Sequence, residues 1–192
     1  GVLFVAAAGN SATDLDQTPY YPAAYASPYI VTVAASDVYD QLAGFSNFGA
    51  ASADLAAPGD DILSARLGGG YVHYSGTSMA APAVAGSIAL MLQQYYSTYV
   101  TTSNFWPSTA RAILMQTAKD LGNPGPDYQW GYGRVDIKAA VDQIIRRGFD
   151  KSAVETDVPQ GADQRVLAII EHHVQCHRNS LIFASFTHYR PP

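Results

Sequence analysis

Continuous apolar runs, separated by polar and proline-rich segments, mark the expected buried strands of this chain. Residues 2–8 read VLFVAAA and residues 30–35 read IVTVAA. Neither run alternates between apolar and polar positions, which is typical of strands covered on both faces of a parallel sheet. Three prolines interrupt residues 11–29, so we expect a loop there. Short strands joined by turns are expected over residues 36–75, one of them at residues 62–65.

Three later segments have helical patterns. Residues 78–96 are apolar almost all round the helix axis, which predicts a helix inside the protein, and Gly86 would let another backbone approach it closely. A second helix is expected over residues 107–120, and a third over residues 136–147 with Asp136 as its N-cap. Buried strands followed by helices of this kind predict an α/β fold.

The composition agrees with one folded domain that carries a small appendage. The chain has 192 residues, of which 48% are hydrophobic and 14% charged, so it can bury a sizeable core and lacks the high charge of disordered chains. The strand and helix patterns all lie in residues 1–147. Residues 148–192 form a linker and an atypical tail, which fits the start of a truncated appended domain.

Charge and cysteine content exclude several classes of function. The net charge of -5 argues against a nucleic-acid partner. No run of about 18 apolar residues is present, so no membrane span is expected. Cys176 is the single cysteine, which excludes an internal disulfide framework and a zinc site built from cysteines.

The segment Gly76-Thr77-Ser78-Met79 carries the sharpest candidate chemistry. Its serine follows a flexible turn and opens the first predicted helix. The unpaired N–H groups and partial positive charge of a helix N-terminus would stabilise negative charge that forms when Ser78 attacks a carbonyl. Serine is also a common N-cap, and this segment alone does not decide between the two roles.

Asn10 stands at the end of the first predicted strand, in the segment AAGN. Ligands of open α/β sheets bind beyond the carboxyl ends of the strands, where an asparagine amide can donate a hydrogen bond to an oxyanion. Gly9-Asn10 is also ordinary turn chemistry, and taken alone it favours a plain turn. Residues 45–49 (FSNFG) and 55–59 (LAAPG) carry neither a nucleophile nor a base, and we interpret them as turns and packing.

Together and in this order, these segments resemble the subtilisin-like (subtilase) serine peptidases over residues 1–147. AAGN is similar to the family's oxyanion-asparagine segment, and FSNFG and LAAPG are similar to its central turns. GTSMAAP is similar to its nucleophile segment, and YGRVD at residues 132–136 to the end of its catalytic domain. The resemblance implies a three-layer α/β/α fold with a mainly parallel sheet, of which this chain supplies the part after the missing N-terminal strands.

The resemblance also implies a role for each matching residue. Ser78 would be the nucleophile of peptide-bond hydrolysis, and Asn10 and the backbone N–H of Ser78 would donate to the oxyanion. Ala8, Gly9 and Thr77 would line the substrate site. The substrate would be a protein or peptide, no cofactor would be required, and the protein would be secreted or exposed at the cell surface.

The rest of the family's catalytic triad has no match in this chain. Its Asp and His lie upstream of the AAGN strand, and His73, only five residues before Ser78, does not fit the family's His segment. A serine without its base stays protonated and weakly nucleophilic, so we expect this chain alone to be inactive. The missing N-terminal part of the catalytic domain is then the expected partner.

Two alternatives stay open at this stage. One is a degenerate subtilase-like domain that only binds a partner. The other is an esterase of the α/β-hydrolase type, because GTSMA approaches the Gly-x-Ser-x-Gly elbow. The acid and base of that second alternative would come from Asp120, Asp127 or Asp136 and from His172 or His173. Residues 71–75 argue against it, since they make a poor buried strand.

No metal site is predicted, although two weak signals exist. In the tail, a spacing of four residues pairs His172 with Cys176 and His173 with His177, but this fits no standard zinc module. In the loop after Asn10, Asp14 and Asp16 could be ligands of a structural calcium ion, and a solvated acidic turn is the favoured interpretation. The aromatic residues of the same loop could form an apolar wall of the substrate pocket: Tyr20, Tyr21 and Tyr25.

Overall fold

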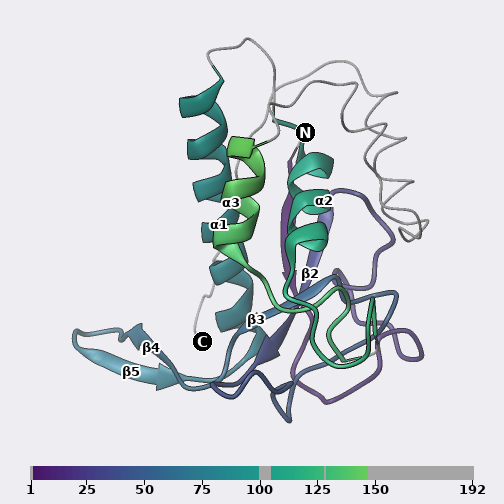
Figure 1. Ribbon diagram of the computed structural model, residues 1–192. Helices are drawn as coiled ribbons and strands as arrows, with labels where there is room; N and C mark the ends of the chain where they lie inside the picture. The colour runs from purple at the N-terminus through teal and green to yellow at the C-terminus, as the bar shows by residue number, and fades with distance from the viewer. Residues whose placement is uncertain (1, 100–104, 128, 147–192) are drawn as a thin grey trace.

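The described part of the chain is a small parallel sheet packed against helices, with a hairpin beside it (Figure 1). The computed structural model describes residues 2–99, 105–127 and 129–146. The strands are β1 (Phe4–Ala7), β2 (Ile30–Ser36), β3 (Leu55–Pro58), β4 (Ile62–Ala65) and β5 (Tyr71–Tyr74). The helices are α1 (Thr77–Thr98), α2 (Pro107–Thr117) and α3 (Ile137–Arg146). The expected appendage, residues 148–192, lies outside the described residues, as do its histidines and Cys176.

The main sheet is parallel, with the strand order β1-β2-β3. In its register Val33 of β2 lies opposite both Ala7 and Leu55, so the carboxyl ends of the three strands meet at one edge. The predicted strands and the parallel α/β class are thereby confirmed. Strand β2 is buried, whereas β1 is buried only at Ala6 and exposes Phe4, so the expected cover on both faces of β1 is wrong for the described residues. The outer edge of β3 is covered, because the Ala56 N–H donates to Gly133 and the Val135 N–H donates back to Ala56.

The two faces of the sheet are buried in different ways. Val31, Val33 and Ala35 of β2 join a large core that includes buried residues from α1, α2 and α3. The alternate residues of β2 point to the other face, where Ala34 lies in a smaller cluster with Trp130 and no helical residue of the described chain. Helix packing on the first face therefore supplies most of the described core.

Helix α1 is less buried than its composition predicts. One row of its residues is exposed, and the row is apolar over Pro82, Gly86, Ala89 and Leu90. A Cβ built on Gly86 would meet no described atom within 4 Å, so the close backbone approach expected there is wrong for the described residues. The exposed row is an apolar helix face without a partner in the described part of the chain.

The other helices begin as predicted, and one ends earlier. Helix α2 stops at Thr117, because Lys119 exchanges backbone hydrogen bonds with Arg134 and so leaves the helical path. The N-cap of α3 is confirmed, since the Asp136 carboxylate accepts the N–H of Ala139 at 2.8 Å. A carboxylate at this position satisfies one of the unpaired N–H groups of the first helical turn.

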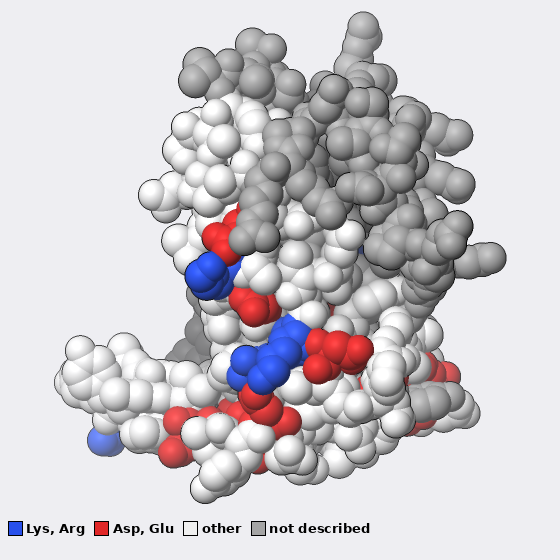
Figure 2. Space-filling view, in the orientation of Figure 1, with Lys and Arg blue, Asp and Glu red and all other residues white. Residues whose placement is uncertain are grey.

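The β4–β5 hairpin projects from the body as an antiparallel arm (Figure 1). It carries exposed apolar side chains, among them Leu67 at 97% and Tyr71 at 76%. On the face that Figure 2 shows, acidic and basic side chains lie side by side. Asp40 forms ion pairs with both Lys119 and Arg134. None of the helices in the described ranges is both long and apolar enough to cross a membrane.

Candidate functional site

Four segments that lie far apart in the sequence meet at the carboxyl edge of the parallel sheet. Asn10 follows β1, and Gly76 directly precedes α1. The Gly76 N–H donates to the Gly59 carbonyl of the LAAPG segment at 2.8 Å. The Asn47 N–H of the FSNFG segment donates to the Gly9 carbonyl at 2.9 Å. All four motifs of the sequence thus belong to one structural unit.

Gly59 shows how closely these segments approach one another. A Cβ at this position would lie 2.7 Å from the Ala35 side chain and 2.9 Å from the Gly76 carbonyl oxygen. Both distances are too short for a real side chain, so only glycine lets LAAPG reach the turn that precedes α1. The glycine of this motif is therefore a requirement of the site's packing.

Ser78 is the second residue of α1 and is exposed to solvent. The N-cap is Gly76, which has no side chain, so the alternative that Ser78 caps the helix is wrong. The Thr77 N–H donates to Asn10 and the Met79 N–H donates to Gly76, whereas the Ser78 N–H has no partner among the described residues. An exposed hydroxyl and a free N–H therefore lie together at the positive end of a 22-residue helix.

The side chain of Asn10 is held by Thr77 through its oxygen. Asn10 Oδ1 accepts hydrogen bonds from the N–H and from the hydroxyl of Thr77, both at 2.9 Å. Because a backbone N–H can only donate, the atom that faces Thr77 must be the amide oxygen. The other end of the amide, Nδ2, has no hydrogen-bond partner within the described ranges, and Asn10 itself is exposed. The two donors that the resemblance implies are therefore both unpaired beside the helix start.

Thr77 also fixes the backbone next to Asn10. It is 1% exposed, and its hydroxyl accepts the Gly9 N–H at 3.1 Å while donating to Asn10. A hydroxyl can do both at once, so a single buried group ties the turn and the asparagine amide together. Thr77, directly before Ser78, is thus a structural part of the candidate site, and its predicted contact with a substrate stays a prediction.

Ala8 and Gly9 use their backbone polar groups inside the protein. The Ala8 N–H donates to Val33 and its carbonyl accepts the side-chain amide of Asn47. Gly9 donates to Thr77 and accepts from Asn47. Their role as substrate-lining residues stays a prediction. They could contact a substrate only by van der Waals packing, because their backbone hydrogen-bonding groups are already paired.

Of the predicted aromatic wall, Tyr20 lies closest to this turn. A Cβ built on Gly9 would lie 3.2 Å from Cδ1 of Tyr20. Tyr21 and Tyr25 stack on each other with ring centroids 4.5 Å apart. All three tyrosines are more than half exposed, between 56% and 58%, and the wall that they were expected to form stays a prediction.

No base for Ser78 is present among the described residues. His73 is the one histidine within the described ranges, and it pairs through Nδ1 with Asp61 at 2.9 Å on the exposed hairpin. No hydrogen bond joins His73 to Ser78. Within the described ranges no histidine is hydrogen-bonded to Ser78, and the lack of a match to the family's His and Asp stays a prediction.

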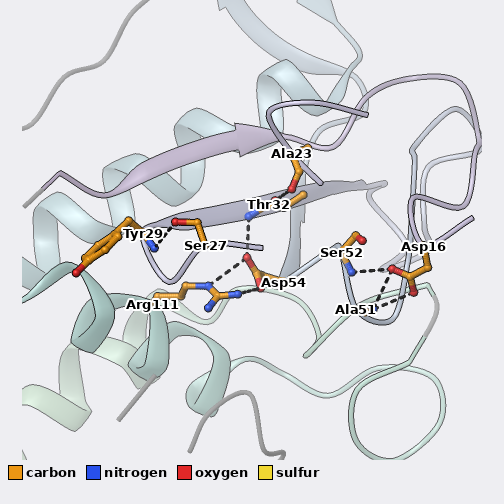
Figure 3. A network of polar contacts seen from close by, with 9 residues as sticks. All are labelled: Asp16, Ala23, Ser27, Tyr29, Thr32, Ala51, Ser52, Asp54 and Arg111. Carbon is orange, nitrogen blue, oxygen red and sulfur yellow. Dashed lines mark hydrogen bonds and ion pairs between the residues drawn. The ribbon is translucent and has the colours of Figure 1, made fainter. Parts of the chain in front are cut away.

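The acidic loop after Asn10 is used for hydrogen bonds rather than arranged as a metal cage. Asp14 accepts the N–H of Asp16, and the Asp16 carboxylate accepts the N–H groups of Ala51 and Ser52, as Figure 3 shows for Asp16. Within the described ranges, no three His, Cys, Asp or Glu side chains are grouped so as to hold a metal ion. The paired carboxylates thus act as loop caps in this structure.

Sequence reasoning missed two buried polar residues, of which Asn47 contacts the Asn10 turn and Asp54 joins β2 to α2. Asn47 belongs to a segment interpreted as a turn, and Asp54 carried no motif. Both are nearly inaccessible, at 2% and 3% exposed, and each makes several hydrogen bonds to backbone N–H groups or to a charged side chain. The available signal was a polar residue in an apolar setting: Asp54 lies between Ala53 and Leu55, and the pair Ser46-Asn47 lies between two phenylalanines.

Fold and site define a parallel α/β protein with an exposed serine at the start of its central helix. A family model described as "Subtilase family" matches residues 1–133, and this chain belongs to that family. The alternative of an α/β-hydrolase-type esterase is therefore wrong. It also fails structurally, because the strand before Ser78 is part of the exposed antiparallel hairpin and not of the parallel sheet.

Relatives of this chain include serine proteases. The chain is 38% identical over 141 residues to a thermophilic serine proteinase of Bacillus sp. strain AK1, covering 73% of this chain and 31% of that protein. It is 43% identical to Nep, a halolysin-like extracellular serine protease of Natrialba magadii, covering 73% and 23%. It is 39% identical to Subtilisin NAT of Bacillus subtilis subsp. natto, covering 73% and 34%.

A solved structure agrees with the fold. The crystal structure of a lanthipeptide protease superposes with a TM-score of 0.66 at 26% identity, covering 74% of this chain and 50% of that chain. This chain therefore spans about a third or less of the proteases it matches in sequence, and half of the structural relative.

Proposed function

We propose that this chain is the nucleophile- and oxyanion-bearing part of a subtilase endopeptidase that hydrolyses protein or peptide substrates. One observation carries the proposal. Thr77 holds the Asn10 amide by its oxygen, which leaves Asn10 Nδ2 and the Ser78 N–H unpaired beside an exposed serine. Both residues are exposed, so water can satisfy these donors until an oxyanion that develops during acyl transfer takes its place.

In the proposed reaction, the Ser78 hydroxyl oxygen attacks the carbonyl carbon of the scissile peptide bond. The negative charge moves to the carbonyl oxygen, where the amide of Asn10 and the N–H of Ser78 donate hydrogen bonds. The N-terminus of α1 adds a favourable partial charge. One such donor contributes about 10²–10³ in kcat, a magnitude measured on a subtilisin itself. The hydroxyl proton must pass to a base, and no described residue is placed to take it.

The base and its orienting acid would come from the rest of the catalytic domain, docked on surfaces that this chain leaves open. One such surface is the free edge of β1. The Phe4 and Ala8 N–H groups donate to β2, so by alternation those of Val5 and Ala7 point away from the sheet. Within the described chain no strand pairs with that edge, and Val2 and Phe4 beside it are each 41% exposed.

The second open surface is the exposed apolar row of α1. Leu90 and Tyr96 on this helix are 48% and 49% exposed. Unpaired strand edges and apolar helix faces are unfavourable in water, so both surfaces suit coverage by further parts of the same fold. We propose that docking of the rest of the catalytic domain on these two surfaces brings the His to Ser78, and that the chain alone is inactive. We also propose that the complete protein is secreted or cell-surface bound, as the extracellular relative suggests. No cofactor takes part in the proposed mechanism.

A fusion protease tests this function. It consists of the part of Subtilisin NAT that carries that enzyme's Asp and His segments, followed by residues 1–147 of this chain. We expect it to cleave a chromogenic peptide and to be labelled at Ser78 by a fluorophosphonate, whereas the 192-residue chain alone is not labelled. Rapid stoichiometric labelling of the chain alone would refute the requirement for a docked base. A folded fusion that binds peptides without cleaving them would favour the alternative of a degenerate binding domain.

A further inference from the structure

Asn47 is a buried residue that contacts the Asn10 turn on both sides of Asn10. Its Oδ1 accepts the N–H groups of Ser11 at 2.9 Å and Thr13 at 3.1 Å. Its Nδ2 donates to the Ala8 carbonyl at 2.9 Å, and its own N–H donates to the Gly9 carbonyl at the same distance. These four hydrogen bonds fix the backbone immediately before and after Asn10 from a single neighbouring residue.

The fit between Asn47 and the turn is close enough to require glycine next to Asn10. Gly9 has a φ of 107°, a conformation that L side chains rarely adopt. A Cβ at Gly9 would lie 2.4 Å from Nδ2 of Asn47, which is well inside van der Waals contact. The Asn47 amide thus occupies the space that any larger residue at position 9 would need.

We propose that Asn47 is a positioning residue for the oxyanion donor Asn10, an inference that rests on the proposed function of Asn10. Thr77 holds the side chain of Asn10, and Asn47 holds the backbone on both sides of Asn10. Both are needed because the asparagine side chain has two rotatable bonds. A shift of the turn would move Asn10 Oδ1 out of hydrogen-bonding distance of Thr77. Asn10 Nδ2 would then no longer point in a fixed direction.

The chemistry of the amide explains why asparagine is suited to this position. Two of its contacts need an acceptor and one needs a donor at the end of the same short side chain. Aspartate keeps the acceptors but loses the donor and places a carboxylate against the Ala8 carbonyl. Alanine loses all three side-chain hydrogen bonds, so the two substitutions separate the contribution of the donor from that of the acceptors.

Ser46 supplies a matched control in the next residue. It is buried to a similar degree, at 1% exposed, and its hydroxyl accepts the Ala35 N–H at 2.9 Å and donates to the Asn47 carbonyl. Its hydrogen bonds are directed toward β2 and to the Asn47 backbone rather than toward the Asn10 turn. Ser46→Ala therefore removes buried hydrogen bonds without removing any contact to residues 8–13.

The test is NMR spectroscopy of the full 192-residue chain labelled with ¹⁵N, comparing Asn47→Ala, Asn47→Asp and Ser46→Ala. In Asn47→Ala we expect the Asn10 side-chain NH₂ signals and the Thr77 amide signal to shift, and the Thr77 amide to exchange about tenfold faster or more. Asn47→Asp should give an intermediate effect. Ser46→Ala should leave these signals in place even if it lowers stability equally. Unchanged Asn10 and Thr77 signals in Asn47→Ala would overturn the proposal.

Activity in the fusion protease separates this inference from the proposed function. If Asn47 acts through Asn10, Asn47→Ala lowers kcat with little change in KM, and it adds no further loss in an Asn10→Ala background. If Asn10→Ala leaves kcat unchanged while the NMR shifts occur, the oxyanion role is refuted and the positioning role of Asn47 stands. If Asn10→Ala lowers kcat but Asn47→Ala moves neither signal nor kcat, only the positioning role fails.

Discussion

Two polar clusters lie at different places in this fold, and they treat their hydrogen-bonding groups in opposite ways. At the end of β1, the Asn10 cluster (Asn10, Thr77 and Ser78) consists of neutral groups. It leaves Asn10 Nδ2 and the Ser78 N–H exposed and unpaired within the described chain. Beneath the sheet, Asp54 accepts the Thr32 N–H and pairs with Arg111 through both oxygens, with side chains only 5% and 13% exposed (Figure 3).

The Asn10 cluster is arranged as a candidate functional site, whereas the Asp54–Arg111 pair is arranged to stabilise the fold. Asp54 and Arg111 join the loop before β3 to α2, and a buried ion pair needs every charge matched because an unpaired one costs several kcal/mol. The Asn10 cluster can leave donors open because they face solvent, where water satisfies them until a substrate arrives. We therefore expect substitutions in the Asn10 cluster to change activity with little effect on stability, and substitutions of the ion pair to do the reverse.

The largest expected effect is on activity at the nucleophile. In the fusion protease, Ser78→Ala should lower kcat by about 10⁶-fold, the loss found when a subtilisin loses its serine. Because Ser78 is exposed and its side chain makes no hydrogen bond within the described chain, the urea midpoint should be unchanged. Peptide hydrolysis and urea unfolding measure the two quantities. A residual activity near that of the unmodified fusion would assign the nucleophile elsewhere.

The largest expected effect on stability is at the ion pair. Asp54→Ala leaves the Arg111 guanidinium buried without its partner and should lower the free energy of unfolding by about 3–5 kcal/mol. Asp60→Ala is the control, because no ion pair or side-chain hydrogen bond involves that aspartate within the described residues. Urea denaturation of the full chain measures both. An Asp54→Ala chain as stable as the control would show that the pair contributes nothing.

Asn10→Ala tests the oxyanion role directly. We expect kcat of the fusion protease to fall by about 10²–10³-fold with KM nearly unchanged, since the lost hydrogen bond forms only as charge develops. Thr77→Val should give a smaller loss, because it removes the hydroxyl hydrogen bond to Asn10 Oδ1 and leaves the one from the backbone N–H of residue 77. A rise in KM at constant kcat would instead indicate that Asn10 binds the substrate uniformly.

A charge on the exposed row of α1 tests the proposed docking surface. Leu90→Asp should change the stability of the chain alone by about 0.5 kcal/mol or less, because Leu90 is half exposed. In the fusion protease, where we propose that this row is covered, it should cost about 1–3 kcal/mol for a buried polar group. Leu67→Asp on the hairpin turn is the control and should be neutral in both proteins. Equal effects of Leu90→Asp in both would refute docking at this face.

The smallest effect concerns the surface cluster around Asp40. Desolvation raises the pKa of Asp40, but the hydrogen bond from Lys119 and the charges of Arg134 and Lys119 outweigh it, so its pKa lies below the ordinary 3.8. A lowered folded-state pKa contributes stability that is present above the ordinary value and lost as the pH falls through the folded value. Asp40→Asn should therefore lower the urea midpoint slightly at pH 7 and not at pH 2. A difference that persists at pH 2 would contradict this assignment.

Much of the fold could be predicted because residue patterns within short segments indicated its strands and helices. The apolar runs at residues 2–8 and 30–35 predicted the strands β1 and β2, of which β2 is buried in the described chain and β1 only in part. Asp136 supplied its own capping group for α3. The burial of α1 was overestimated, because the apolar character of a helix shows which faces can be buried but not whether a partner covers them.

The site was predicted in part for the same reason. Ser78 and Asn10 stood out through motifs whose chemistry is carried by their own side chains. Asn47 did not, because its importance lies in contacts with residues 34 to 39 positions away, which no local pattern contains. The pairing of Asp54 with Arg111 spans 57 positions and was invisible for the same reason.

By itself, the sequence determined the class of this protein, its buried strands, the start of its central helix, and the identity of the candidate nucleophile and oxyanion donor. Only the tertiary structure decided which end of the Asn10 amide is held, which N–H groups stay free, and that a buried asparagine from a third segment fixes the turn. The physical reason is that side-chain identity is local, whereas hydrogen-bond satisfaction depends on which distant backbone groups the fold brings within 3 Å or so.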